Sequence, residues 1–467
     1  MRNRRPFRAI KGVRDILPPE SEQWNRVEQV AREVFATYGF GEIRLPIFES
    51  TELFARSVGS ETDIVSKEMY TFADAGADEE SRETQISLRP EATASVCRAY
   101  IEHGMHTWPG DVKLYYIGPM FRRERPQKGR YRQFYQIGAE VLGQSDTPGL
   151  DAEVIEMLLV FFRRVGLDTP LGEVRTKAAE DRRNDSSSAS AAPPHLRPVT
   201  LFINSIGCPA CRPSYVEQLR NALETVRDQL GPDSQRRIQT NPLRVLDSKL
   251  DSEQAVIETL PRITDHLCAA CREHYVRLQE QLELRGIPFV ENWRLVRGLD
   301  YYTRTTFEVT APGLGAQNAV CGGGRYDGLI ELLGGPRNVK GIGFAIGTDR
   351  LLLSLQDRAQ PKGPSGKAAQ ARLDAFLVWM GSAEYPAAVR LARLLRAAGR
   401  RVELPHDALK LRRALELADK LGARFAVLIG EEEIASGKFT VKHLSTGEQT
   451  QCVEADLIRH IQAAAQN

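Results

Sequence analysis

The stretch of sequence that decides the fold reads RGLDYYTRTTFE at residues 297–308 and GGGRYDG at residues 322–328. In strand register, the first piece places polar side chains on one face, including Tyr302, Arg304 and Glu308. Three consecutive glycines weaken a strand unless another backbone segment or a ligand approaches closely. The stretch therefore predicts a sheet with one face built for a polar ligand, or else a solvated sheet face beside a flexible loop.

Length and composition limit the class of protein. The chain has 467 residues, which suggests roughly three domains. Its formal net charge of +2 means that nucleic-acid contacts must come from local basic patches. Seven cysteines, an odd number, argue against a disulfide framework. No apolar run reaches the ~20 residues of a membrane span and no signal-peptide core is evident, so we expect a cytoplasmic protein with no membrane partner.

Local patterns predict two structural elements around the polar stretch. Strand-like segments between residues 113 and 142 flank the basic loop RERPQKGR (123–130), which indicates a hairpin with a long tip. The sequence GIGFAIGTDRLLL at 341–353 indicates a strand that turns into a helix. Both elements place charged residues close to the ends of predicted strands.

Composition also marks the boundaries between parts of the chain. Polar, low-complexity sequence at 181–198 predicts a disordered linker or loop that does not pack, and the Pro/Gly/Lys-rich run at 360–367 predicts the last boundary. Residues 199–285 predict a separate inserted module in which strand and helix alternate. Residues beyond 371 alternate in the same way and predict an α/β domain.

Side chains suited to a polar ligand recur in the predicted strands. Gln136 and Glu140 share one strand face with Gly138 between them, which predicts a pocket floor, although a solvent-facing sheet is the alternative. Arg122 and Arg297 stand in apolar or glycine-containing sequence, where an arginine needs an anion.

A further arginine, Arg350, follows a predicted helix start, where the helix dipole disfavours a cation unless an anion binds. For each of the three arginines, a local ion pair is the competing explanation. The chain contains neither a P-loop nor a dinucleotide fingerprint after a strand. Any nucleotide would therefore be held by arginines on an antiparallel sheet.

Four cysteines form two C-x-x-C pairs: Cys208 with Cys211, and Cys268 with Cys271. Two such pairs can supply the four thiolates of a structural zinc site. The separation between the pairs exceeds the usual zinc-finger spacing, so four reduced cysteines without a metal remain the alternative.

With these residues in view, the chain closely resembles the histidyl-tRNA synthetases, a family of class II aminoacyl-tRNA synthetases. Segments 39–49, 116–143 and 341–353 resemble the three class motifs, and segments 297–308 and 322–329 resemble two more specific histidine signatures. The resemblance implies an α+β fold: an antiparallel sheet flanked by helices, an inserted α/β-type module and a C-terminal α/β anticodon-binding domain.

The resemblance also implies a division of the chain into domains. The expected parts are the first half of the catalytic core at 1–170, an insertion domain at 171–285, the second half of the core at 286–358, a linker at 359–370 and the anticodon-binding domain at 371–467. Any zinc would be structural and confined to the insertion, because the cysteines are not part of the family's catalytic pattern.

The implied activity is that of a histidine–tRNA ligase acting as a homodimer. Such an enzyme uses ATP with Mg²⁺ to convert L-histidine to histidyl-adenylate and pyrophosphate, and then transfers histidine to the 3′ end of its tRNA. The rival is a paralogue with the same fold, the regulatory subunit of ATP phosphoribosyltransferase. That subunit typically lacks the anticodon domain and has a degraded histidine signature, whereas this chain keeps both.

The resemblance further implies roles for single residues. Arg122 would contact the ATP α-phosphate, Arg297 would stabilise charge there as the main catalytic group, and Arg350 would hold the γ-phosphate. The expected contacts of the hairpin tip with the tRNA acceptor stem are Arg125, Gln127, Lys128 and Arg130.

The histidine substrate would be held by a second group of residues. Glu140 and Tyr302 would bond the two imidazole nitrogens, with Tyr301 beside them, and a site built in this way rejects isosteres that lack those nitrogens. The residues expected at the α-amino group are Glu91, Thr93 and Gln136.

Overall fold

The computed structural model describes residues 7–60, 62–73, 85–167, 198–311, 314, 318–359 and 373–463. The chain forms two compact units, Met1–Gln360 and Pro361–Asn467, each with its own core. The expected linker or loop at 181–198, apart from its last residue, and the run at 360–367 lie outside the described residues.

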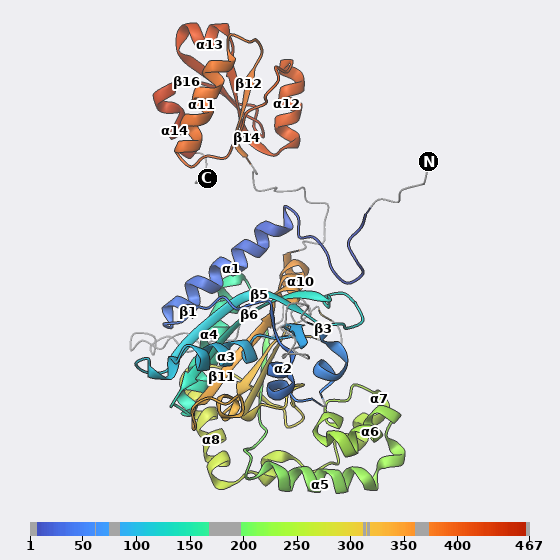
Figure 1. The fold of residues 1–467 in the computed structure, drawn as a ribbon. Coiled ribbons are helices and arrows are strands. Elements are labelled where there is room, and N and C mark those ends of the chain that lie inside the picture. Colours follow the sequence, from blue (N-terminus) through green and yellow to red (C-terminus); the bar gives the residue numbers. More distant parts are fainter. Residues whose placement is uncertain are drawn as a thin grey trace, which may run out of the picture. The chain divides into compact units, whose positions relative to one another are not determined.

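The first unit is built on an eight-stranded sheet, antiparallel except for the pairs at its two edges (Figure 1). This arrangement confirms the predicted α+β class with a large antiparallel sheet. Its strands, in spatial order, are β1 (Gly41–Glu42), β5 (Val112–Phe121), β6 (Gln133–Gly143), β11 (Lys340–Gly347), β10 (Ala319–Arg325), β9 (Thr303–Thr310), β7 (Thr200–Ser205) and β8 (Val290–Glu291). A small second sheet has the order β2 (Phe48–Ser50), β4 (Gln85–Leu88) and β3 (Tyr70–Ala73).

Long helices pack against the large sheet. Helix α1 (Glu20–Thr37) repeats apolar residues every three or four positions and buries that stripe. Its Phe35 ring lies 5.5 Å from Tyr115 on β5, 5.9 Å from Phe344 on β11 and 5.9 Å from Phe161 on α4 (Pro148–Val165). One face of the sheet is therefore closed by α1 and α4. Further helices of the first unit include α2 (Thr51–Val58), α3 (Thr93–Glu102), α9 (Leu329–Leu332) and α10 (Thr348–Ala359).

The predicted hairpin and the predicted strand-to-helix turn are both present. Strands β5 and β6 pair antiparallel from Val112–Leu142 to Phe121–Gln133 and leave the basic loop at their tip. Strand β11 runs directly into α10, which begins at Thr348. Both elements were predictable because their patterns are local.

The structure differs from the predicted separate module at 199–285. Its strand, β7, pairs antiparallel with β9 inside the large sheet, and α8 (Ala269–Leu284) packs on α4. The residue types at 200–205 predict a strand, but they do not indicate that this strand pairs with β9. Between β7 and α8 the chain folds into the short helices α5 (Arg212–Thr225), α6 (Pro232–Thr240) and α7 (Asp251–Ile257), which lie together at one side of the first unit (Figure 1).

The second unit is the expected α/β domain. Its sheet has the order β13 (Val402–Glu403), β12 (Leu373–Trp379), β14 (Ala423–Ile429), β15 (Lys438–His443) and β16 (Gln449–Val453), with the first three strands parallel. Alternate residues of β12 enter two apolar clusters on opposite faces. Helices α11 (Tyr385–Ala397) and α14 (Glu454–Ala463) cover one face, α12 (Leu411–Lys420) covers the other, and α13 (Glu431–Ser436) follows β14. No helix in the described parts of either unit combines the length and apolar character that crossing a membrane requires.

Candidate active site

A cavity of about 1130 Å³ opens on the face of the large sheet opposite α1 and α4. Alternation along β6 sends Ile137 and Ala139 into the apolar core and Gln136 and Glu140 into the cavity. Residues from both halves of the first unit meet here. The predicted residues that line it are Glu91, Thr93, Arg122, Arg130, Gln136, Glu140, Arg297, Tyr301, Tyr302 and Arg350.

Glu140 is the buried acid at the centre of the cavity. Only 1% of the residue is exposed, and its two carboxylate oxygens accept hydrogen bonds from Thr93 Oγ1 at 2.7 Å and from the Tyr326 hydroxyl at 2.6 Å. Burial raises the pKa of Glu140 to about 8, against the opposing effect of the two hydroxyl donors. A Cβ on Gly343, its cross-strand partner, would stand 1.7 Å from the carboxylate. Glycine at that position is what makes room for the acid.

Glu91 is fixed at the start of a helix. Its two oxygens accept the backbone N–H groups of Thr93 and Ala94, at 2.8 and 2.9 Å, in the first turn of α3. Burial raises the pKa of Glu91, and these two backbone donors oppose the shift. Thr93 joins both acids, because its N–H binds Glu91 and its hydroxyl binds Glu140.

Aromatic side chains close the cavity around Glu140. The Tyr301 ring centroid lies 4.8 Å from that of Tyr302 and 5.8 Å from that of Tyr326. Burial raises the pKa of Tyr301 and of Tyr302, so both keep their hydroxyl protons as potential donors. The buried Tyr116 hydroxyl and Gln136 Oε1 have no hydrogen-bond partner among the described residues. Buried polar atoms of this kind are usually satisfied by something, so these two are suited to a polar ligand.

Two of these tyrosines were not predicted from the sequence. Tyr116 faces Gly138 across the β5–β6 pair, and a Cβ on that glycine would stand 2.3 Å from the Tyr116 hydroxyl. Gln136 and Glu140 line the cavity, as the predicted pocket floor requires, but the Tyr116 ring covers Gly138 between them. Tyr326 lies in the RYD segment directly after β10, and no local pattern indicated that its hydroxyl would reach Glu140.

Arg297 is held against the glycine triplet. Its Nη1 donates to Glu308 Oε2 at 2.8 Å, while its buried Nε has no partner among the described residues. A Cβ on Gly322 would lie 1.9 Å from Nη2 of this guanidinium. A Cβ on Gly323 would meet the Gly343 carbonyl oxygen at 2.4 Å. Gly322 therefore leaves room for the Arg297 side chain, and Gly323 for the backbone of β11. These two contacts explain the glycines without a substrate lying against their backbone.

Two further arginines line the same cavity. Arg122 donates from Nε to the Pro90 carbonyl at 2.9 Å, and its guanidinium lies 5.2 Å from the Phe134 ring centroid. Arg350 projects from the first turn of α10, where burial and the nearby Arg130 lower its pKa. Three arginines around one cavity form a cationic wall suited to a polyphosphate.

Arg304 differs from its prediction. Its φ is +50°, and the β9–β10 register shifts at this position. The irregularity interrupts the strand alternation, so that Arg304 Nη1 forms an ion pair with Asp146 Oδ2 at 3.0 Å. A regular strand would have aimed Arg304 at the same face as Glu308.

Comparison with known proteins identifies the family. A family model described as histidyl-tRNA synthetase matches residues 12–173 and 216–351, and an anticodon-binding-domain model matches residues 374–464. The chain belongs to the histidyl-tRNA synthetase family. The gap between the two matched segments includes Cys208 and Cys211.

Curated and solved relatives agree with this family. The chain is 49% identical to a histidine–tRNA ligase of Koribacter versatilis, over 97% of this chain and 96% of the relative. It is 48% identical to one of Solibacter usitatus, over 98% and 100% of the two chains. The crystal structure of apo S. aureus histidyl-tRNA synthetase is 36% identical, with a TM-score of 0.74 over 98% of this chain and 100% of that chain.

In this member of the histidyl-tRNA synthetase family, the β5–β6 loop carries its basic residues outward. Arg125, Gln127 and Lys128 are exposed. Arg130 turns back and pairs with Glu124 at 3.1 Å, and backbone bonds between Gln127 and Arg130 close the tip. Of the four predicted loop residues, Arg130 lines the main cavity, whereas the other three face solvent.

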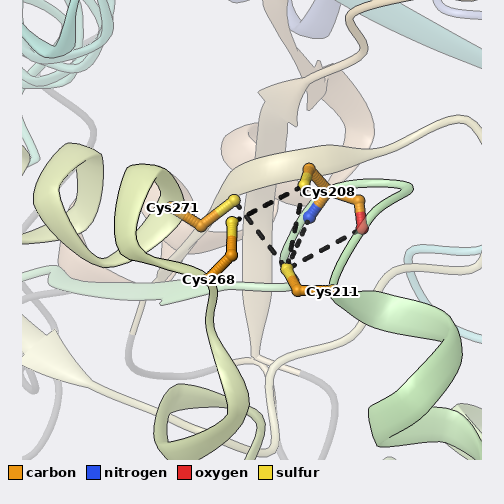
Figure 2. Close-up of side chains that lie close together, drawn as sticks. All are labelled: Cys208, Cys211, Cys268 and Cys271. Atoms are coloured by element: carbon orange, nitrogen blue, oxygen red, sulfur yellow. Dashed lines mark hydrogen bonds between the residues drawn. The ribbon is translucent and has the colours of Figure 1, made fainter.

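The structure also brings the four predicted cysteines of this synthetase-family chain together. Their sulfur atoms all lie within 4.8 Å of one another, and none forms a disulfide (Figure 2). The cluster is outside the main cavity, with one pair between β7 and α5 and the other at the start of α8. Local spacing predicted each pair, and the fold supplies their proximity.

Proposed function

We propose that the chain is a histidine–tRNA ligase. The observation that carries this proposal is the single cavity in which a buried carboxylate with hydroxyl partners lies beside three arginines. In the first step, the histidine carboxylate attacks the α-phosphorus of ATP and pyrophosphate leaves. In the second step, the 3′-hydroxyl of the terminal tRNA adenosine attacks the adenylate carbonyl, and AMP leaves.

The buried end of the cavity fits the amino acid. A carboxyl oxygen of Glu140 accepts one imidazole N–H, and the Tyr302 hydroxyl donates to the other ring nitrogen, with Tyr301 packing beside the ring. The α-ammonium group needs acceptors, and Gln136 Oε1 is a buried acceptor without a partner among the described residues. Glu91 and Thr93 complete that end of the pocket.

The arginine wall fits ATP. Arg122 contacts the α-phosphate, Arg297 neutralises charge that develops there, and Arg350 holds the γ-phosphate. Glu124 and Glu308 line the same wall, and carboxylate oxygens are ligands that Mg²⁺ prefers. Magnesium bound with ATP would supply further neutralisation of phosphate charge.

The remaining partners follow from the family. Exposed Arg125, Gln127 and Lys128, with Arg130 behind them, contact the tRNA acceptor stem, and residues 371–467 bind the anticodon. We also infer a homodimer that works in the cytoplasm. The proposed domain limits remain the core at 1–170 and 286–358, the insertion at 171–285 and the linker at 359–370, although β7 and α8 of the proposed insertion pack on the core.

The alternative function, a regulatory subunit of ATP phosphoribosyltransferase, is not favoured. Such a subunit typically lacks an anticodon domain, whereas residues 374–464 match an anticodon-binding model. Both histidine-signature segments also contribute side chains to the cavity.

The test is histidine-dependent exchange of labelled pyrophosphate into ATP by the purified chain with magnesium. We expect exchange with histidine and none with other amino acids. Arg297→Ala should lower the exchange rate by about a hundredfold or more and leave histidine binding nearly intact. Arg285→Ala is a matched control, because Arg285 is equally half-buried and ion-paired, to Glu156, but lies outside the cavity lining. Unsubstituted protein without exchange would contradict the proposal.

A further inference from the structure

The cysteine cluster has the dimensions of a single-metal site. The Sγ atoms of Cys208 and Cys211 are 3.8 Å apart, and those of Cys208–Cys268 and Cys211–Cys271 are each 3.9 Å apart (Figure 2). A tetrahedral ion with metal–sulfur bonds of about 2.3 Å places its sulfur ligands about 3.8 Å from each other. Disulfide-bonded sulfurs would be far closer, at about 2.05 Å.

The chain builds this cluster from two tight turns. The first lies between β7 and α5, where the N–H groups of Cys211 and Arg212 both donate to the Cys208 carbonyl. In the second, Cys268 immediately precedes α8 and Cys271 lies in its first turn. Cys208 and Cys268 are 60 residues apart in sequence, so a shared metal would fasten together both ends of the helical insertion.

The charges around the sulfurs fit a metal–thiolate centre. Four thiolates and one divalent cation carry a net charge of −2. Arg212 is close enough to Cys208 and Cys211, and Arg304 to Cys271, for electrostatic attraction. The two guanidinium groups offset the charge that such a centre would have.

The first cysteine turn is bonded directly to the segment that carries Tyr302. Arg212 Nη2 donates to the Tyr302 carbonyl at 2.6 Å, and the Arg304 N–H donates to the Gly207 carbonyl at 2.8 Å. The Ile206 N–H donates in return to the Arg304 carbonyl at 2.9 Å. These bonds bracket the backbone irregularity at Arg304, which lies two residues after Tyr302 and one residue after the start of β9.

We propose that the four cysteines bind one structural zinc ion, and that this zinc positions Tyr302 in the cavity through the turn at residues 206–212. The second half of the proposal rests on the proposed function, because it makes Tyr302 a positioning target within the histidine site. The zinc-binding half of the proposal is independent of the proposed function.

The zinc is tested by elemental analysis of the full chain, purified under reducing conditions without added metal. We expect about one zinc per chain. Cys208→Ser should lose it, and Cys452→Ser is the matched control, because Cys452 is a buried cysteine of the second unit outside the cluster. Cys268→His should retain zinc, since histidine also ligates this metal. Less than about half an equivalent in the unsubstituted chain, iron in place of zinc, or equal zinc in Cys208→Ser would overturn the assignment.

The link to Tyr302 is tested with Arg212→Met, which removes the side-chain bonds to the Tyr302, Ile206 and Gly207 carbonyls and keeps all four cysteines. We expect one zinc per chain, a KM for histidine raised about tenfold or more, and a KM for ATP little changed. An unchanged KM for histidine would overturn the link. If the unsubstituted chain shows no histidine-dependent exchange, the proposed function and the link both fall, whereas the zinc measurement still decides the metal site.

Discussion

The guanidinium of Arg297 occupies the space that a side chain at the position of Gly322 would need, on the face of the large sheet. Its Nη2 lies only 1.9 Å from the place of a Cβ there. Glu308, the cross-strand partner of Gly322 on β9, accepts a hydrogen bond from the same guanidinium at 2.8 Å. The glycine triplet and the arginine of the two signature segments thus form one structural unit.

Gly322→Ala should therefore act through Arg297. The far end of an arginine is flexible, so the added methyl group displaces the guanidinium with little effect on folding. We expect the rate of pyrophosphate exchange to fall by about a hundredfold, as when a transition-state charge contact is lost. Exchange kinetics and thermal unfolding of the same protein samples measure the two effects separately.

Gly149→Ala provides the control for this substitution. Gly149 lies in the first turn of α4, and a Cβ there would meet Gln281 at an ordinary 3.6 Å. Unchanged exchange is expected for this variant. A Gly322→Ala protein with normal exchange would show that Arg297 does not need its observed position.

Glu140 makes the free energy of unfolding depend on pH. Its pKa is about 8 in the folded protein and 4.5 in an ordinary setting, so the folded state binds more protons between these values. The stability contributed by protonated Glu140 is full below pH 4.5 and is lost as the pH rises to about 8. The loss is about 1.4 kcal/mol per unit of pKa difference, which amounts to a few kcal/mol.

Glu140→Gln removes this titration and keeps the shape of the side chain. Denaturant unfolding of the two proteins should therefore show the variant gaining stability relative to the unsubstituted chain from pH 4.5 to 8. Parallel stability curves over that range would mean that Glu140 titrates near its ordinary pKa.

A buried ion pair lies behind the histidine-signature strands. Arg325, with no exposed side-chain surface, donates from Nε to Asp151 at 2.8 Å, and Thr305 donates to the same carboxylate at 2.7 Å. Arg325→Met would leave Asp151 buried beside fewer donors, so we expect a loss of about 3–5 kcal/mol in denaturant unfolding. Arg390→Met, at the exposed pair with Glu454, should cost less than about 1 kcal/mol. Similar losses for the two variants would contradict this account.

Local patterns in the sequence identified the hairpin, the strand-to-helix turn at Thr348 and both cysteine pairs. In each case the residues that define the feature are close in sequence. Arg122 and Arg297 were also predictable, because charged residues in apolar segments need a partner. Glu140 was predicted from the strand face that it shares with Gln136, and Arg350 from its place in a first helical turn.

Contacts between distant residues were not predictable in this way. Tyr326 and Glu140 are 186 residues apart, and Arg325 and Asp151 are 174 apart. Pairing of β7 with β9 likewise depends on the whole sheet. A single irregularity, the φ of +50° at Arg304, was enough to turn that side chain away from its predicted face.

The exposed basic tip of the β5–β6 hairpin predicts an effect on tRNA alone. Arg125 and Lys128 are exposed and absent from the main cavity lining, so Arg125→Ala with Lys128→Ala should leave pyrophosphate exchange unchanged. Aminoacylation should show a higher KM for tRNA and a shallower dependence on salt, because two phosphate contacts are lost. The control pair Arg277→Ala with Arg337→Ala removes two positive charges from exposed positions of the first unit outside the hairpin. If the double hairpin variant aminoacylates tRNA normally at all salt concentrations, the loop does not contact the acceptor stem.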